Sequence, residues 1–176
     1  VKYLLSILVL GLSLSADGQE GEKTTRHRIS LGIGHTVVGQ GLDDNGRNSW
    51  LSLPMWVLDY DYSLSRKWSI GVHTDFLTES FKVEGFFFKE ETAEIERTYP
   101  ISVLAACSFK PGAHALYSIG LGAEYSESGS YYMTRFGFEY GIELPGDWEL
   151  APGVTYDLKW SAYDSFSIAL AVGKKF

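Results

Sequence analysis

The chain has 176 residues, of which 15% are aromatic, 19 are glycine and 5 are proline, and its formal net charge is −7 at pH 7. This length supports one domain at most, and the composition favours strands and tight turns over helices. The negative charge, with no basic stripe anywhere in the sequence, argues against a nucleic-acid partner.

The first 18 residues differ in character from the rest of the chain. Lys2 precedes an apolar run at residues 3–14, which is too short to span a bilayer as a helix. Small and polar residues follow, so we expect residues 1–18 to be a signal peptide that is cleaved after Gly18. An uncleaved anchor helix is the alternative. Residues 19–25 then form a polar N-terminal linker.

The remainder, residues 26–176, alternates large apolar residues with small or polar ones, which is the period-two pattern of β-strands. We expect eight strands, at residues 26–38, 50–63, 68–76, 99–109, 117–125, 132–142, 148–160 and 165–176. The end of the third strand stays open, because its alternation can continue through Phe81 and Val83. Leu104 interrupts the polar face of the fourth strand.

The predicted connections alternate in length along the chain. Tight turns follow strands two, four and six, at residues 65–67, 110–112 and 145–147. More variable loops follow the other strands, including a long polar loop at 39–49 and a charged segment at 89–97, the expected tip of the largest loop. Because consecutive strands are antiparallel, this alternation places all the tight turns at one end of the sheet and all the longer loops at the other end.

The two faces of the strands differ sharply. In the last strand Phe166, Ile168, Leu170 and Val172 alternate with Ser, Ala and Gly, whereas soluble sheets usually carry Lys, Glu and Thr on their outer face. Aromatic residues on the apolar face form two belts that bracket an apolar band, as interfacial Trp and Tyr do in membranes. We assign Trp68, Trp148 and Phe176 to the tight-turn end, and Trp50, Trp56, Tyr125, Tyr132 and Trp160 to the other end.

A final strand that ends in Phe176 resembles the assembly signal of bacterial outer-membrane barrels. With eight strands and alternating connections, residues 26–176 resemble the small OmpA- and OmpX-like outer-membrane proteins, as a pattern and not through a motif that names one family. The resemblance implies an all-β, eight-stranded antiparallel up-and-down transmembrane β-barrel in the outer membrane. It also implies a monomer whose partners are outer-membrane lipid and the barrel assembly machinery.

The small faces of the strands would line a lumen just wide enough for side chains to fill. Charged residues on these faces must pair, and we expect nine of them to form one interior polar network: Asp59, Asp61, His73, Asp75, Glu124, Arg135, Glu139, Asp157 and Lys159. Three-residue turns place Asp59 opposite His73 and Arg135 opposite Asp157. A proton- or metal-responsive site is one interpretation, but the spacing matches no metal motif. A plug of paired charges is favoured, with no metal or cofactor.

His35 falls by parity on the lipid side, between Ile33 and Val37. Outer-membrane lipid deacylases carry a lipid-facing His with a Ser nucleophile and an acidic partner. No outward Ser or carboxylate is expected beside His35 on strands two and eight, so we predict an interfacial histidine and no catalytic residue. Cys107 is the only cysteine and cannot form an internal disulfide.

The sequence favours an outer-membrane barrel with a structural or cell-surface interaction role, its interior filled rather than open. The alternatives are a lipid-modifying outer-membrane enzyme and a soluble lipocalin-like barrel that binds a ligand. A lipocalin-like arrangement would turn the apolar face inward and place both tryptophan belts inside.

Overall fold

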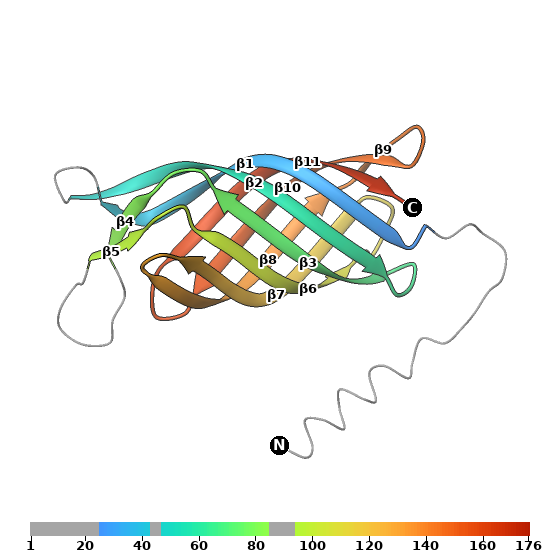
Figure 1. Ribbon diagram of the computed structural model, residues 1–176. Coiled ribbons are helices and arrows are strands. Elements are labelled where there is room, and N and C mark those ends of the chain that lie inside the picture. Colours follow the sequence, from blue (N-terminus) through green and yellow to red (C-terminus); the bar gives the residue numbers. More distant parts are fainter. Residues whose placement is uncertain (1–24, 43–46, 85–93) are drawn as a thin grey trace, which may run out of the picture.

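The computed structural model describes residues 25–42, 47–84 and 94–176 (Figure 1). The predicted signal peptide (1–18) and all but the last residue of the predicted linker (19–25) lie outside the described residues. Within the described part of the chain, no helix is long and apolar enough to cross a membrane.

The described strands form one closed antiparallel barrel, as predicted. Eight long strands form the barrel wall, and we call them the staves: β1 (His27–Leu42), β2 (Asn48–Ser63), β3 (Trp68–Leu77), β6 (Ile101–Phe109), β7 (Ala115–Ser126), β8 (Gly129–Tyr140), β10 (Trp148–Lys159) and β11 (Asp164–Lys175). A short strand, β9 (Ile142–Leu144), continues β8 and pairs with β10. Consecutive staves pair with each other, and the barrel closes where β11 pairs with β1 from Arg28↔Lys175 to Val38↔Ser165.

A short hairpin connects β3 to β6 at the long-loop end of the barrel (Figure 1). Its strands are β4 (Phe81–Glu84) and β5 (Glu94–Arg97), and β4 also pairs with β1 through Val83 and Gly41. The expectation that residues 89–97 are only a loop tip is therefore wrong for 94–97, which form β5; residues 89–93 lie outside the described residues.

The long polar loop predicted at residues 39–49 is also too long, because β1 continues to Leu42 and β2 begins at Asn48. The register shifts between Val38 and Gly41, after which Gly41 pairs with Ser49. A bulge of this kind absorbs an irregularity without ending the ladder. Polar residues can therefore continue a strand where no apolar face has to be buried.

The inside and outside of the barrel follow the predicted parity. Along β11, Leu170 is 47% exposed and its neighbour Ala171 only 7%. All eight aromatic residues assigned to the two belts are exposed, and Leu104 is buried inside at 1%. A band of apolar side chains thus covers the exterior, so the lipocalin-like arrangement is wrong.

The small inner face has a steric cause, which Gly122 shows most clearly. A Cβ at this position would lie 2.0 Å from the carbonyl oxygen of Val103 and 2.6 Å from Cα of Leu104, both on the neighbouring strand β6. Backbone atoms cannot move aside as the end of a side chain can. The tight curvature of a narrow barrel therefore selects glycine at such inward positions.

We expect Leu170→Arg to destabilise the barrel in lipid vesicles by about 2–4 kcal/mol, because an arginine would face the middle of the apolar band. The free energy of unfolding in urea measures this cost. Leu170→Ala is the control that removes the side chain without adding charge. An arginine variant as stable as the alanine variant would contradict the assignment of this face to lipid.

Candidate functional site

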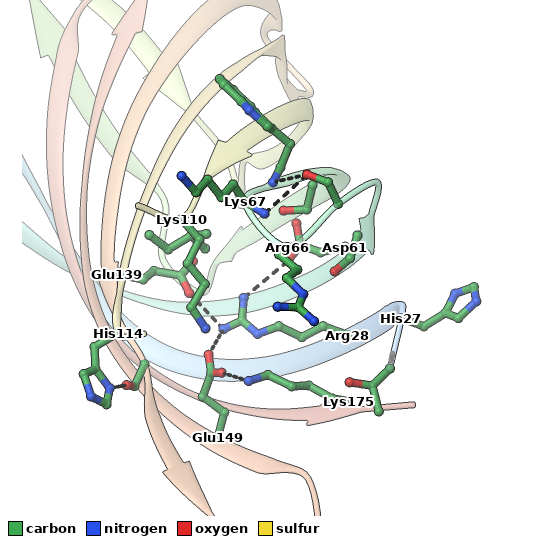
Figure 2. A pocket seen from close by; sticks show the side chains of 17 residues that line it. His27, Arg28, Asp61, Arg66, Lys67, Lys110, His114, Glu139, Glu149 and Lys175 are labelled. Atoms are coloured by element: carbon green, nitrogen blue, oxygen red, sulfur yellow. Dashed lines mark hydrogen bonds and ion pairs between the residues drawn. The ribbon is translucent and has the colours of Figure 1, made fainter. Parts of the chain in front are cut away.

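The lumen holds most of the buried charge of the described chain, arranged in layers from the tight-turn end to the long-loop end. The layer nearest the tight turns centres on Arg28, which projects inward from β1 into a vestibule of about 90 Å³ (Figure 2). Its guanidinium lies 2.8 Å from Glu139, 3.3 Å from Asp61 and 3.4 Å from Glu149. One cation thus joins carboxylates from β2, β8 and β10.

Two further contacts extend this layer. The Nε2 atom of His73 lies 3.1 Å from Oδ1 of Asp61, and Nζ of Lys175 lies 2.5 Å from Glu149. Asp59 is directly opposite His73, as the turn length predicts, but its carboxylate instead accepts the backbone N–H of Thr74 at 3.3 Å. His73 therefore contacts Asp61, which is diagonal to it in the register, and not Asp59, which is directly opposite.

The middle layer is built on Arg135, which is 3% exposed. Arg135 is opposite Asp157 in the register, as predicted, and donates to both of its carboxylate oxygens, from Nε and Nη2, at 2.7 Å each. Nη2 also donates to Asp75 on β3. This contact crosses the lumen, so the guanidinium ties one wall of the barrel to another.

The outer layer surrounds the carboxylate of Glu124, which is 1% exposed. Arg97 of the hairpin lies 2.7 Å away, and the Tyr163 hydroxyl donates to the same carboxylate at 2.7 Å. Lys159 lies 3.7 Å from both Glu124 and Asp157 and so connects this layer to the middle one. Burial and the adjacent Glu124 carboxylate raise the pKa of Tyr163, in the β10–β11 turn, well above its ordinary value.

Apolar side chains close the lumen at the long-loop end. The hairpin contributes Phe81, Val83 and Ile95, all buried to 7% exposure or less. They pack with inward residues of the staves and with the β10–β11 turn, namely Val38, Leu53, Met55, Val57, Leu77, Ala162 and Tyr163. We call this cluster the apolar plug. The vestibule lies at the opposite end of the barrel, beside the tight turns.

A smaller cavity of about 40 Å³ lies between the layers. Its lining combines the charged side chains of Asp59, His73, Asp75, Arg135 and Glu139 with apolar ones such as Met55, Val57 and Val154. Its volume is sufficient for about two or three water molecules. Water on its charged side can complete the hydrogen bonding of these groups.

Eight of the nine residues predicted for the interior network are buried, and Glu139 is partly buried at the vestibule. Eight of the nine belong to two connected sets, one around Arg28 and one running from Arg135 to Glu124. The carboxylate of Asp59 instead accepts the backbone N–H of Thr74. Sequence reasoning missed Arg28, Glu149, Arg97 and Tyr163. Arg28 and Glu149 occupy inward positions in the alternation of their strands, so the sequence pattern could have identified them. Arg97 and Tyr163 come from a hairpin and a turn, where the alternation does not predict which side chains point inward.

The described residues form neither a metal site nor the complete Ser, His and acidic group of a lipid hydrolase. No group of three or more His, Cys, Asp or Glu there could hold a metal ion. The expectation that no outward serine lies beside His35 is wrong, because Ser52 Oγ is 3.3 Å from its Nδ1. Ser52 is diagonal to His35 in the register, two residues from its direct partner Pro54. In the described part of the chain, however, no carboxylate contacts His35 to orient the ring.

Solved structures of outer-membrane proteins resemble this chain in fold. Ail, the attachment invasion locus protein of Yersinia pestis, is 17% identical over 86% of this chain and 98% of Ail, with a TM-score of 0.52. Neisserial surface protein A is 11% identical over 85% of this chain and 97% of its own, also with a TM-score of 0.52. No protein-family model and no curated protein matches the chain. The similarity confirms the predicted fold, that of small eight-stranded outer-membrane barrels.

The Arg135–Asp157 pair gives a direct test of the middle layer. Removing either partner leaves the other charge buried, so we expect Arg135→Met or Asp157→Asn to cost about 3–5 kcal/mol. A double-mutant cycle in urea with the barrel in detergent measures their coupling. Exchanging the two residues should recover only part of the loss, because Asp75 also binds Arg135. Coupling within error of zero would contradict the pair.

Proposed function

We propose that this protein is a monomeric outer-membrane barrel with a structural or cell-surface interaction role, and that it is neither an open pore nor an enzyme. Its long-loop end faces the cell exterior and its tight turns face the periplasm, the usual asymmetry of these barrels. The observation that carries the proposal is the set of side chains inside the barrel. Buried ion pairs join strands that are not neighbours at three levels, and the apolar plug lies at the outer end.

The length of two strands supports a surface role. β1 and β2 have 16 residues each, whereas a tilted strand needs only about 9–11 to cross the membrane. Their ends therefore project beyond the bilayer, beside the β4–β5 hairpin, as an extended β-ribbon (Figure 1). Such a projection can present a surface to a partner outside the membrane.

The sequence of the connections at the long-loop end favours a basic partner. The segments at 39–49 and 78–100 together carry eight Asp or Glu and four Lys or Arg. Among the described residues of this end, Glu79, Glu96 and Glu127 are exposed, and so are Arg47 and Lys82. Ail has also been crystallised with the heparin analogue sucrose octasulfate, which is strongly anionic. An acidic end would repel such a ligand, so we propose that this chain differs from Ail in the charge of what it binds.

The second candidate function, a lipid-modifying enzyme, rests on the contact between His35 and Ser52. Both side chains are exposed on the outer wall. A serine nucleophile, however, also needs a base that is held in the correct tautomer and a group that stabilises the oxyanion. Because the described residues offer no orienting carboxylate, a structural contact is the better account.

Recordings from planar bilayers test the closed lumen. We expect the purified, heat-modifiable barrel to give no step conductance above that of protein-free bilayers, because the apolar plug interrupts the water path. An open porin inserted under the same conditions is the positive control. Reproducible steps from the folded barrel would overturn the proposal.

Labelling of intact cells tests the orientation in the same study. In a Cys107→Ser background, a membrane-impermeant maleimide should modify Glu127→Cys at the long-loop end. It should modify Asp147→Cys, in the tight turn before β10, only after the outer membrane is permeabilised. The opposite result would reverse the orientation.

A further inference from the structure

The lipid-facing wall contains a groove that the closed lumen does not explain. It runs across β2, β3, β6 and β7, has a volume of about 710 Å³ and is lined almost wholly by apolar atoms. This volume falls within the roughly 300–1,000 Å³ of sites that hold a small ligand. We call it the exterior groove.

The exterior groove exists because strand β6 presents small side chains between large ones. Cys107 pairs with Ile70 on one side and with Ile119 on the other. One rung further, Ala105 pairs in the same way with Val72 and Leu121. Small residues flanked by bulky ones leave a hollow between them on the outer surface. The outward face of β11 has no such gap, because every outward position from residue 166 to residue 172 carries a large apolar side chain, Phe, Ile, Leu or Val.

One edge of the exterior groove is polar and basic. Tyr60 and Tyr62 of β2 line this edge. The Tyr60 hydroxyl lies 2.9 Å from Nδ1 of His27, and Arg26 Nη1 donates to the Tyr62 hydroxyl at 3.5 Å. The Arg26 and His27 side chains are both exposed. Figure 2 shows His27 directed away from the vestibule, whereas the next residue, Arg28, points into it.

This edge lies at the tight-turn end, where lipid headgroups would be. Trp68 and Phe109, the next rung toward the turns from Ile70 and Cys107, form a tilted ring pair 4.8 Å apart on the exterior. Aromatic side chains of this kind mark the level of the headgroups. The exterior groove thus begins beside the membrane interface and runs into the apolar band.

We propose that the exterior groove and the Arg26–His27 pair bind one anionic phospholipid of the leaflet on the tight-turn side. An acyl chain lies along the groove over Ala105 and Cys107. The phosphate accepts charge-assisted hydrogen bonds from the Arg26 guanidinium and a hydrogen bond from a ring N–H of His27, with the tyrosine hydroxyls as further donors. The inference rests on the membrane placement proposed above, but not on the lumen being closed.

The charge at the edge selects this occupant over a neutral lipid. An apolar groove alone would accept any acyl chain, whereas a cationic side chain at the membrane surface favours an anionic headgroup. A second copy of this chain is the other possible occupant. A second copy would have to fill the concave groove with its own outer wall. The Arg26–His27 edge of each copy would then face either the apolar surface or the same edge of the other copy, which is unfavourable.

Native mass spectrometry of the full chain, refolded in mild detergent, tests the proposal with phosphatidylglycerol and phosphatidylcholine of identical acyl chains. We expect the wild type to bind one phosphatidylglycerol about ten-fold more tightly than phosphatidylcholine. The double variant Arg26→Gln with His27→Gln removes the arginine charge and the imidazole donor. It should weaken phosphatidylglycerol binding about five-fold or more and leave phosphatidylcholine binding unchanged. Ala105→Phe, which fills the groove, should weaken the binding of both lipids.

Two matched variants act as controls on the opposite side of the barrel. Lys174→Gln removes a partly buried cation that contacts the Trp148 ring and the Gly146 carbonyl, and Ile168→Phe enlarges a lipid-facing residue of β11. Neither should change lipid binding. Cys107→Leu repeats the groove test if Ala105→Phe does not show the heat-modifiable mobility of a folded barrel.

Three results would overturn the proposal. These are equal affinity of the wild type for the two lipids, a loss with Lys174→Gln as large as that with the double variant, and a wild-type dimer that Ala105→Phe dissociates. The last would identify a second copy as the occupant. None of them bears on the conductance recordings, so the lipid site and the closed lumen stand or fall separately.

Discussion

The structure depends on one constraint: an eight-stranded barrel has a lumen that its own side chains must fill. Strand curvature leaves little room at the wall, as the close approach of Gly122 to the backbone of Val103 shows. Only a few long side chains can then cross the remaining space, and those that carry charge need a partner within reach. Arg28 and Arg135 meet this need by binding carboxylates from several strands at once.

These buried ion pairs specify the arrangement of the lumen more than they add to its stability. Removing two charges from water costs about as much as their attraction returns, so an intact pair contributes little net free energy. A single unpaired charge, in contrast, is strongly unfavourable. A misaligned register would separate Arg135 from Asp157, and the same penalty therefore disfavours incorrect strand pairing. The apolar plug contributes in a different way, by burial of hydrocarbon at the mouth.

Sequence alone predicted the parts of this molecule that strand periodicity controls. Parity assigned the apolar face to the exterior, and the length of the tight turns placed Asp59 opposite His73 and Arg135 opposite Asp157. Arg97 and Tyr163 were missed because longer connections have no period and no fixed register. Ser52 was missed for a related reason: it contacts His35 along the diagonal, and only direct partners had been considered.

The most direct test of the account uses the chain's two methionines. Met55 and Met133 are 4% and 1% exposed inside the lumen, so their labelled methyl groups report on it by NMR in nanodiscs. If the lumen is filled and closed, a water-soluble gadolinium chelate should broaden these two signals less than the signals of exposed loop residues, and a spin-labelled lipid should broaden them less than the signals of outward-facing methyl groups. Broadening by the chelate as strong as in the loops would show an open lumen. Broadening by the lipid as strong as on the outer wall would show that the faces of the strands are reversed.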